Sequence, residues 1–247
     1  MRFSAPWILS VVALFFLASS LPASGQQASS DSSPGFQILV DRAYGQDQEL
    51  VNGKQYYDHH PRSLGNPYLL EGFVHQGSVN IRGVTYYNVW LRYDIYNQQV
   101  EVEYSTLGGA DNQVVLVNDR LKEFRIGQYA FKNLSFQGEE KRIYQVIGSE
   151  RLICYISWEK KLIPRVGDSK FTEQYTPRKR KYLLELDGKI HEFQSKRDFV
   201  KLFPEVHKKA IKRLVRQNNM QFKIASPEQL NLFLMAASKL LNEEVGG

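Results

Sequence analysis

Apolar and polar residues alternate along one segment near the middle of the chain, Tyr87–Tyr104. The odd positions from Tyr87 to Ile95 are apolar, and so are the even positions from Val100 to Tyr104. A period of two residues is typical of a strand with one buried face. The pattern therefore predicts two neighbouring strands joined by a short turn.

The pairing register of these two strands follows from their apolar faces. Pairing Ile95 with Val100 places the apolar side chains of both strands on one face, and it sets Arg92 opposite Glu103. A slip by one residue would place Glu103 in the core, where an unpaired charge is costly. We therefore expect the turn to be centred on Asn97–Gln98.

Other segments rich in β-branched and aromatic residues predict further strands. They are Tyr68–His75, Val79–Arg82, Val114–Val117, Lys122–Ile126, Ile143–Ile147 and Leu152–Trp158. Gly148–Ser149 is expected to form the turn between the last two. Strands this frequent, separated by short turns, predict an antiparallel β-rich body in the form of a curled sheet, a barrel or a sandwich.

A hairpin and three short helices are predicted at the C-terminal end. The hairpin pairs Tyr182–Leu186 with Ile190–Phe193, because Asp187–Gly188 suits a two-residue turn. Ser195 can cap the first helix, Lys196–Phe203. The fold class is therefore α+β, with the β-rich body followed by a β-hairpin and three short C-terminal helices.

The second and third helices each have a start signal and an apolar stripe. Pro204 ends the first helix and suits the first turn of the second, and Ser226–Gln229 is a capping box for the third. The stripe of the second helix is Val206, Ala210, Ile211, Leu214 and Val215. The stripe of the third helix is Leu230, Phe233, Leu234, Ala237 and Leu241.

The N-terminus has the composition of a cleaved secretory signal peptide. Arg2 precedes the apolar run Ile8–Leu17, and Ala23–Gly25 is an acceptable cleavage site. A run this short does not span the ~30 Å core of a bilayer, so no transmembrane segment is expected after cleavage. No cysteine stands directly after the run, where a lipid-attachment site would lie, so a lipoprotein is not expected. We expect the protein to be periplasmic or extracellular.

These patterns divide the chain into five regions. Residues 1–25 are the signal peptide, and the polar, Ser-rich residues 26–35 predict a disordered tether. Residues 36–158 form a β-rich domain, residues 159–181 a charged connector, and residues 182–247 the hairpin with the helical C-terminal region.

Charge and cysteine content narrow the class of protein. Residues 26–140 carry 9 basic and 14 acidic side chains, whereas residues 141–216 carry 20 basic and 9 acidic side chains. This asymmetry indicates two regions with different surroundings.

Cys154 is the single cysteine, which excludes an intrachain disulfide and favours a bacterial envelope protein with a large core. It shares a strand face with Leu152 and Ile156, so we expect it to be buried.

Two segments resemble a family of exported, β-rich proteins from Bacteroidetes-type bacteria. They are VNIRGVTYYNVWLRYDIY (Val79–Tyr96) and YLLELDGKIHEFQSKRDFVKLFPEVHKKAIKRLVRQNNMQF (Tyr182–Phe222). The resemblance covers about Leu50–Leu241. It implies a bacterial envelope location and one recurring architecture. The family has no established activity, so the resemblance implies no site residues.

The chain has no complete catalytic, metal-site or nucleotide-binding motif. Asp58–His60 and His75 do not complete a metal site, because adjacent histidines on an extended segment point to opposite sides. His191–Glu192 lacks the second histidine, four residues after His191, of a zinc-protease helix. We therefore expect a non-enzymatic protein without a cofactor. A hydrolase ranks third, after a binding or scaffolding protein and a glycan-binding module.

Two groups of residues are candidates for binding. Basic side chains on the polar face of the second helix could attract an anionic surface, an acidic glycan or a negatively charged protein. They are Lys208, Lys209, Lys212, Arg213 and Arg216. Trp90 and Tyr96 could stack on the sugar rings of a glycan. The basic run Arg178–Lys181 resembles a nucleic-acid patch, but export argues against a nucleic-acid partner.

The sequence thus predicts an exported cell-envelope protein that binds or scaffolds an unknown envelope partner. A glycan-binding module is the main alternative.

Overall fold

The computed structural model describes residues 48–72, 74–105, 109–136, 138–149, 151–167 and 170–243. These residues belong to one compact unit of the chain. The expected signal peptide (1–25), the tether (26–35) and the first part of the β-rich region (36–47) lie outside the described residues.

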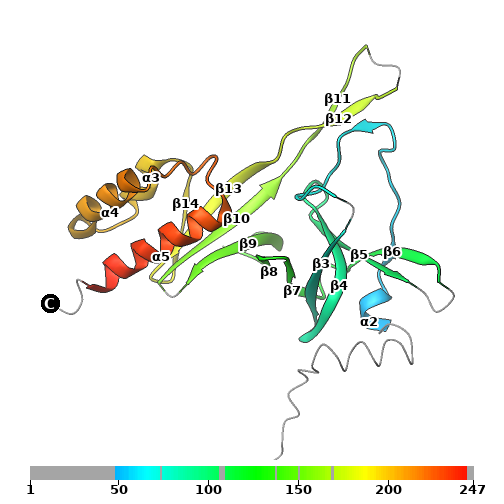
Figure 1. Cartoon of the computed structure of the whole chain (residues 1–247), viewed down its shortest axis with the longest axis horizontal. Coiled ribbons are helices and arrows are strands. Elements are labelled where there is room, and N and C mark those ends of the chain that lie inside the picture. The colour runs from blue at the N-terminus through cyan, green and yellow to red at the C-terminus, as the bar shows by residue number, and fades with distance from the viewer. Residues whose placement is uncertain are drawn as a thin grey trace, which may run out of the picture. The chain divides into compact units, whose positions relative to one another are not determined.

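Eleven strands form one antiparallel sheet (Figure 1). In sheet order they are β1 (Lys54–Gln55), β6 (Asp111–Val115), β5 (Gln99–Ser105), β4 (Val84–Asp94), β3 (His75–Ile81), β7 (Leu121–Ile126), β8 (Tyr129–Leu134), β9 (Arg142–Ser149), β10 (Leu152–Glu159), β13 (Lys179–Leu186) and β14 (Lys189–Phe193). The predicted antiparallel, β-rich body is confirmed. β1 and β14 are its two edges, so the sheet is open and not a barrel.

A smaller, three-stranded sheet combines two strands from the segment between β10 and β13 with one strand that precedes β3. β11 (Leu162–Pro164) pairs antiparallel with β12 (Glu173–Tyr175), and β12 pairs in parallel with β2 (Ser63–Leu64). The expected charged connector, residues 159–181, thus contains two strands and the first residues of β13. The short helix α2 (Gln48–Val51) precedes β1.

Three helices follow β14, as the sequence predicts: α3 (Lys196–Lys201), α4 (Glu205–Gln217) and α5 (Pro227–Glu243). The side chain of Ser195 caps α3 by accepting a hydrogen bond from the backbone N of Asp198 (3.1 Å). The predicted capping box of α5 is present, because Gln229 N donates to Ser226 Oγ (3.2 Å) and Ser226 N donates to Gln229 Oε1 (3.0 Å). None of the described helices is both long and apolar enough to cross a membrane.

The core beneath the helices lies on one face of β9, β10 and β13. Leu152, Cys154 and Ile156 alternate along β10 and are fully buried, and Leu184 of β13 is paired with Cys154. Helix α5 packs across β9 and β10. Its predicted apolar stripe is buried in full: Leu230, Phe233, Leu234, Ala237 and Leu241.

The stripe predicted for the second helix is only partly right. Ile211 and Val215 are buried, and Ala210 and Leu214 are half-buried. Val206 is 67% exposed. It stands in the first turn of α4, before the part of the helix that packs, so helical spacing alone assigned it to the wrong environment.

The predicted register of the β4–β5 hairpin is wrong by two residues. Arg92 lies opposite Glu101, not Glu103. The turn is shifted because the side chain of Asp94 accepts hydrogen bonds from the backbone N of Tyr96 and of Asn97, both at 2.8 Å. These bonds centre the turn between Tyr96 and Asn97, one residue earlier than expected, which changes each cross-strand partner by two residues. A shift by two keeps the same side chains on the same faces.

A β-bulge interrupts the predicted alternation of β4. Asn88 has a positive φ of 56°, and the pairing with β3 shifts register between Gly77 and Ser78. The extra residue moves the buried position from Tyr87 to Tyr86, which is 3% exposed. The alternation of apolar and polar residues does not reveal a bulge, so the sequence did not predict this one.

Other strand boundaries also differ from the prediction. Of the expected strand Tyr68–His75, Tyr68 forms an isolated bridge with Asp94 and His75 begins β3. Gly148–Ser149 is not a turn, because both residues are paired with β10. Strand β8 was not predicted. By contrast, the hairpin turn at Asp187–Gly188 is confirmed, since both residues have positive φ angles (49° and 75°).

We predict that Cys154 is unreactive in the folded protein. Burial excludes solvent from the thiol and raises its pKa above the ordinary value, so little thiolate forms at pH 8. A maleimide should modify the native protein slower by roughly two orders of magnitude than the denatured protein, because reaction must await unfolding. Equal rates in buffer and in concentrated guanidinium chloride would show that β10 is wrongly placed.

Candidate functional site

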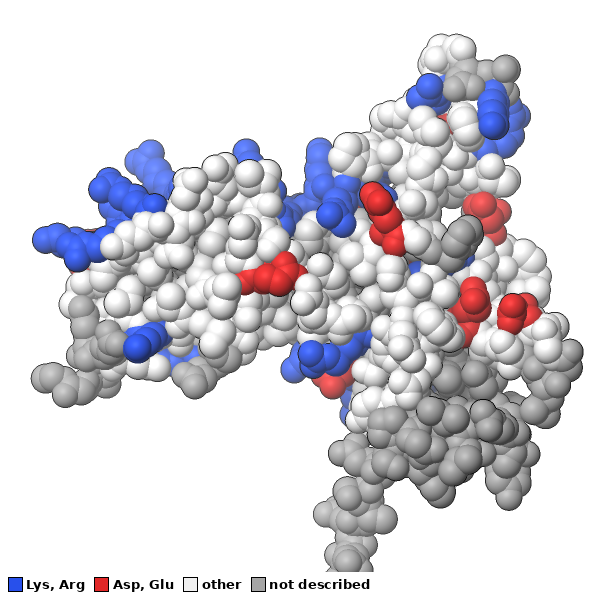
Figure 2. Space-filling view, viewed as in Figure 1, with Lys and Arg blue, Asp and Glu red and all other residues white. Residues whose placement is uncertain are grey.

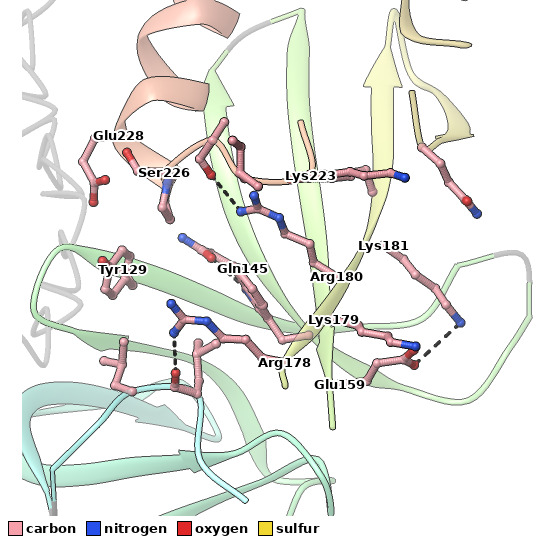
Figure 3. Close-up of a pocket in the computed structure, with 18 residues that line it drawn as sticks. Tyr129, Gln145, Glu159, Arg178, Lys179, Arg180, Lys181, Lys223, Ser226 and Glu228 are labelled. Carbon is pink, nitrogen blue, oxygen red and sulfur yellow. Dashed lines mark hydrogen bonds and ion pairs between the residues drawn. The ribbon is translucent and has the colours of Figure 1, made fainter. Parts of the chain in front are cut away.

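A cleft of about 930 Å³ opens on the face of β10 and β13, beyond the part that the helices cover (Figure 3). Three separate parts of the chain form its walls: the strands, residues 69–70, and residues 223–228 at the start of α5. The aromatic side chains in its lining are Tyr129, Trp158 and Tyr182. We treat this cleft as the candidate functional site.

Strand alternation decides which basic side chains point into this cleft. Tyr182 faces the core, so Arg180 and Arg178, two and four residues earlier, project from the same side of the chain. Lys179 and Lys181 project from the opposite side, as Figure 3 shows. The side that is apolar beneath the helices therefore becomes basic where the helices end.

Both arginines are held in place by main-chain carbonyls and by an indole ring. Arg180 Nη1 donates to Ala225 O (2.8 Å), and Arg178 Nη1 donates to Leu69 O (2.7 Å). The guanidinium carbons lie 5.4 Å (Arg180) and 5.6 Å (Arg178) from the centre of the Trp158 ring. Cation–π contacts of this kind favour a fixed guanidinium.

No described carboxylate forms an ion pair with Arg178 or Arg180. Two acidic residues line the cleft, and each has another partner: Glu159 Oε2 lies 3.7 Å from Lys181 Nζ, and Glu228 accepts a hydrogen bond from Gln128. Burial lowers the pKa of Arg180, and the nearby Arg178 acts in the same direction. The cleft therefore holds a partly desolvated positive charge with no described counter-ion.

Two further features add positive potential to the cleft. Lys223 lines the same wall as Ala225. The α5 N-terminus, with Ser226, Pro227 and Glu228, also borders the cleft, and the N-terminal end of a helix carries a partial positive charge. Five basic and two acidic residues contribute to the lining, but Lys179 and Lys181 project from the far side of β13, which leaves Arg178, Arg180 and Lys223 as the basic side chains of the cleft.

A second arginine environment in the protein provides a contrast. Arg92 is paired with Glu101, whose side chain is fully buried. Glu101 also accepts hydrogen bonds from Gln113 Nε2 (3.0 Å) and Tyr68 OH (3.3 Å). Burial raises the pKa of Glu101, and Arg92 opposes this rise. Arg92 is therefore an internally neutralised, structural arginine, unlike Arg178 and Arg180.

The basic residues predicted on the second helix do lie on the surface of α4. Lys208 Nζ is bound to Glu205 Oε1 at 2.6 Å, and the other four are exposed: Lys209, Lys212, Arg213 and Arg216. In Figure 2, Lys and Arg side chains gather over α4 at the left of the view. None of the five lines the cleft, so they form a separate basic surface.

The predicted sugar-stacking pair does not form one platform. Trp90 is 49% exposed on β4, whereas Tyr96 lies in the turn at the end of that strand. At ~3.3 Å per residue, about 13 Å separate Trp90 from the end of the strand at Asp94. The ring of Tyr96 instead contacts Tyr175 (5.5 Å between centres) and His60 (5.8 Å).

The histidines considered as metal ligands are also separated. His60 Nδ1 lies 2.9 Å from Glu173 Oε2, and His59 is exposed. Within the described ranges, no three His, Cys, Asp or Glu side chains are grouped so that they could hold a metal ion.

Sequence reasoning missed the cleft because its walls are distant in the chain. It treated Arg178–Lys181 as one basic run in a connector, although every second residue points to the other side. A signal was present: Arg178 and Arg180 keep the period of two that the apolar Tyr182 and Leu184 begin. Extending that strand backwards would have separated the two arginines from the two lysines.

We predict that the same substitution lowers stability by very different amounts in the two arginine environments. Arg92→Gln leaves Glu101 buried without its cation and should cost about 3–5 kcal/mol of unfolding free energy. Arg180→Gln removes a charge with no described carboxylate partner and should cost about 1 kcal/mol or less. Urea denaturation at pH 7 measures both.

The pH dependence of the Arg92→Gln variant provides a further check. Loss of Arg92 raises the pKa of Glu101 further, so the folded state of the variant binds a proton more tightly than the unfolded state. The loss of unfolding free energy of the variant relative to wild type should shrink as the pH falls and grow as the pH rises through that pKa.

The urea experiment can also contradict our reading of the cleft. It would do so if Arg180→Gln cost as much unfolding free energy as Arg92→Gln.

Comparisons of the chain with protein-family models, with curated proteins and with solved structures find no match. The resemblance to an exported Bacteroidetes-type family stays a prediction, and the candidate site is argued from its geometry alone.

Proposed function

We propose that the protein is an exported, non-enzymatic component of a bacterial cell envelope that binds an anionic ligand in the cleft. The observation that carries the proposal is the pair Arg178 and Arg180, fixed in place without a described counter-ion. The ligand would carry phosphate, sulfate or carboxylate groups, which match the planar donor arrangement of a guanidinium.

The hydrogen-bonding capacity of the two arginines supports this proposal. A guanidinium has five N–H groups. In both Arg178 and Arg180, Nη1 donates to one carbonyl, and no described residue accepts from the other nitrogens. Pre-positioned donors bind an anion without first losing side-chain entropy. A cleft of about 930 Å³ lies within the usual size range of small-ligand sites.

The chemistry of the cleft favours binding over catalysis. Guanidinium groups stay protonated at neutral pH, so they hold charge and are poor general acids or bases. The acidic residues of the lining, Glu159 and Glu228, are each engaged with another side chain. A hydrolase is therefore the least supported of the three functions.

The basic face of α4 is proposed as a secondary surface. Its exposed charges act at long range, so they attract an anionic ligand without fixing its position. Such attraction weakens with added salt, since the Debye length is about 10 Å at 0.1 M and shorter above it.

We predict that the exported protein lacks residues 1–25, and mass spectrometry of the intact protein measures this. If residues 1–25 are removed on export, the protein recovered from the envelope fraction begins close to Gln26. Its intact mass should be lower than the 28.6 kDa of the full chain by the whole segment. Recovery of a chain that retains Phe15 and Phe16 would contradict cleavage.

We predict that the cleft binds polyphosphate. Each charge-assisted hydrogen bond contributes about 1.5–3 kcal/mol, so Arg178→Gln with Arg180→Gln should weaken binding about 100-fold. The α4 variant Lys208→Gln, Lys212→Gln, Arg216→Gln should weaken it less than tenfold, and only at low salt. Isothermal titration calorimetry at two salt concentrations measures these affinities.

Thermal melting serves as the control for these variants, and neither should shift the melting temperature by more than a few degrees. If the α4 variant abolished binding while the cleft variant retained it, α4 would be the site and our assignment of the cleft would be wrong.

A further inference from the structure

A second, smaller cavity lies beside the turn between β4 and β5. Its volume is about 200 Å³, so it has room for one ring and not for a drug-sized ligand. Residues 54–60, Pro67, the turn residues Asp94, Asn97 and Gln99, and Tyr175 of β12 line it.

The walls of this cavity are aromatic and held in fixed positions. The Tyr175 ring is nearly perpendicular to the rings of His60 (89°) and Tyr96 (76°), and such edge-to-face contacts fix the orientation of a ring. Tyr57 is 62% exposed, and its hydroxyl donates to Gln55 Oε1 at 2.8 Å. Tyrosine rings offer an apolar surface on which the C–H face of a sugar ring can pack.

The polar groups of the cavity suit hydroxyl groups. Asp94 is 1% exposed, and its carboxylate is held by the backbone N of Asn97 (2.8 Å) and by Asn97 Nδ2 (2.7 Å). Lys54 adds donors, and Asp58 adds acceptors. A hydroxyl both donates and accepts hydrogen bonds, so a sugar can use both kinds of group.

The same polar groups disfavour an anion in the cavity. Asp58 and Asp94 face it, with Lys54 as its basic residue. Their field also acts on Tyr175: burial raises the pKa of its hydroxyl, and Asp94 and Asp58 raise it further. The cavity therefore differs in charge from the basic cleft.

One short segment of the chain contributes to both the cavity and the cleft. Pro67 lines the cavity, and Leu69 and Leu70 line the cleft. Hydrogen bonds hold this segment from two sides, because Leu69 N donates to Tyr93 O (3.0 Å) and Arg178 donates to Leu69 O. One short, fixed segment thus separates an aromatic cavity from a basic cleft.

We propose that the cavity is a subsite for a neutral sugar ring, and that cavity and cleft together select a glycan with anionic substituents. This inference rests on the proposed function, because the cleft supplies the anion site. It assigns the sugar to Tyr57 and Tyr175 and the anionic groups to Arg178 and Arg180.

Three polymers separate the two contributions: dextran sulfate, neutral dextran and polyphosphate. The cavity variant is Tyr57→Leu with Tyr175→Leu, and Tyr57→Leu alone serves as a second variant because Tyr57 is exposed. The matched control is Trp90→Leu, an exposed aromatic residue that lines neither site. Circular dichroism melts confirm that each variant is folded.

The double cavity variant should lower the affinity for dextran sulfate about tenfold and leave the affinity for polyphosphate within twofold. Tyr57→Leu alone should lower the affinity for dextran sulfate by a smaller factor. The cleft variant Arg178→Gln, Arg180→Gln should lower both affinities, and Trp90→Leu should lower neither. Wild-type protein should bind dextran sulfate more tightly than neutral dextran.

Two results would overturn the inference in distinguishable ways. If the cavity variants bind dextran sulfate like wild type while the cleft variant binds both polyanions weakly, the sugar subsite is wrong and the proposed function stands. If wild-type protein binds neither polyanion at low salt, the proposed function fails and the inference fails with it.

Discussion

The pairing of β10 with β13 determines both the core and the candidate site. Eight residues of each strand are paired, from Leu152 with Leu186 to Glu159 with Lys179. One side of this ribbon carries Cys154 and Leu184, which lie beneath α5. The same side carries Trp158 and Arg180 further along, past the part of the sheet that α5 covers. Because alternation fixes the side, the apolar packing at one end orients the basic side chains at the other. The cleft is thus a consequence of a sheet that extends beyond its helical layer.

The two halves of the sheet have different electrostatic roles. In the N-terminal half, buried charges such as Glu101 and Asp94 are satisfied internally, by Arg92 and by the backbone of the β4–β5 turn. A buried charge without partners would destabilise the fold, so these groups support structure, and Asp94 also lines the small cavity. In the C-terminal half, arginines are fixed by carbonyls and left without a described carboxylate. The excess of basic residues in 141–216 therefore includes the arginines of the cleft and the exposed basic residues of α4.

Local patterns predicted local structure well. The Asp187–Gly188 turn and the α5 stripe were correct because both depend on residues close in sequence. The predicted β4–β5 register was wrong because the side chain of Asp94 caps the turn. The strand face predicted for Tyr87 was wrong because the bulge at Asn88 shifts the alternation by one residue. The cleft was beyond local reasoning, since its walls come from residues 69–70, the β10–β13 ribbon and residues 223–228. Composition identified an excess of basic residues, and only the tertiary fold distinguished the arginines of the cleft from the exposed residues of α4.

The central claim is that Arg178 and Arg180 form an anion site in the cleft. A crystal structure of the protein grown with tungstate tests this directly, since the anomalous scattering of tungsten locates the anion independently of any model bias. Our account predicts a tungstate ion within hydrogen-bond distance of both guanidinium groups, next to Trp158. A cleft without tungstate in crystals that hold ordered tungstate on α4 would contradict it.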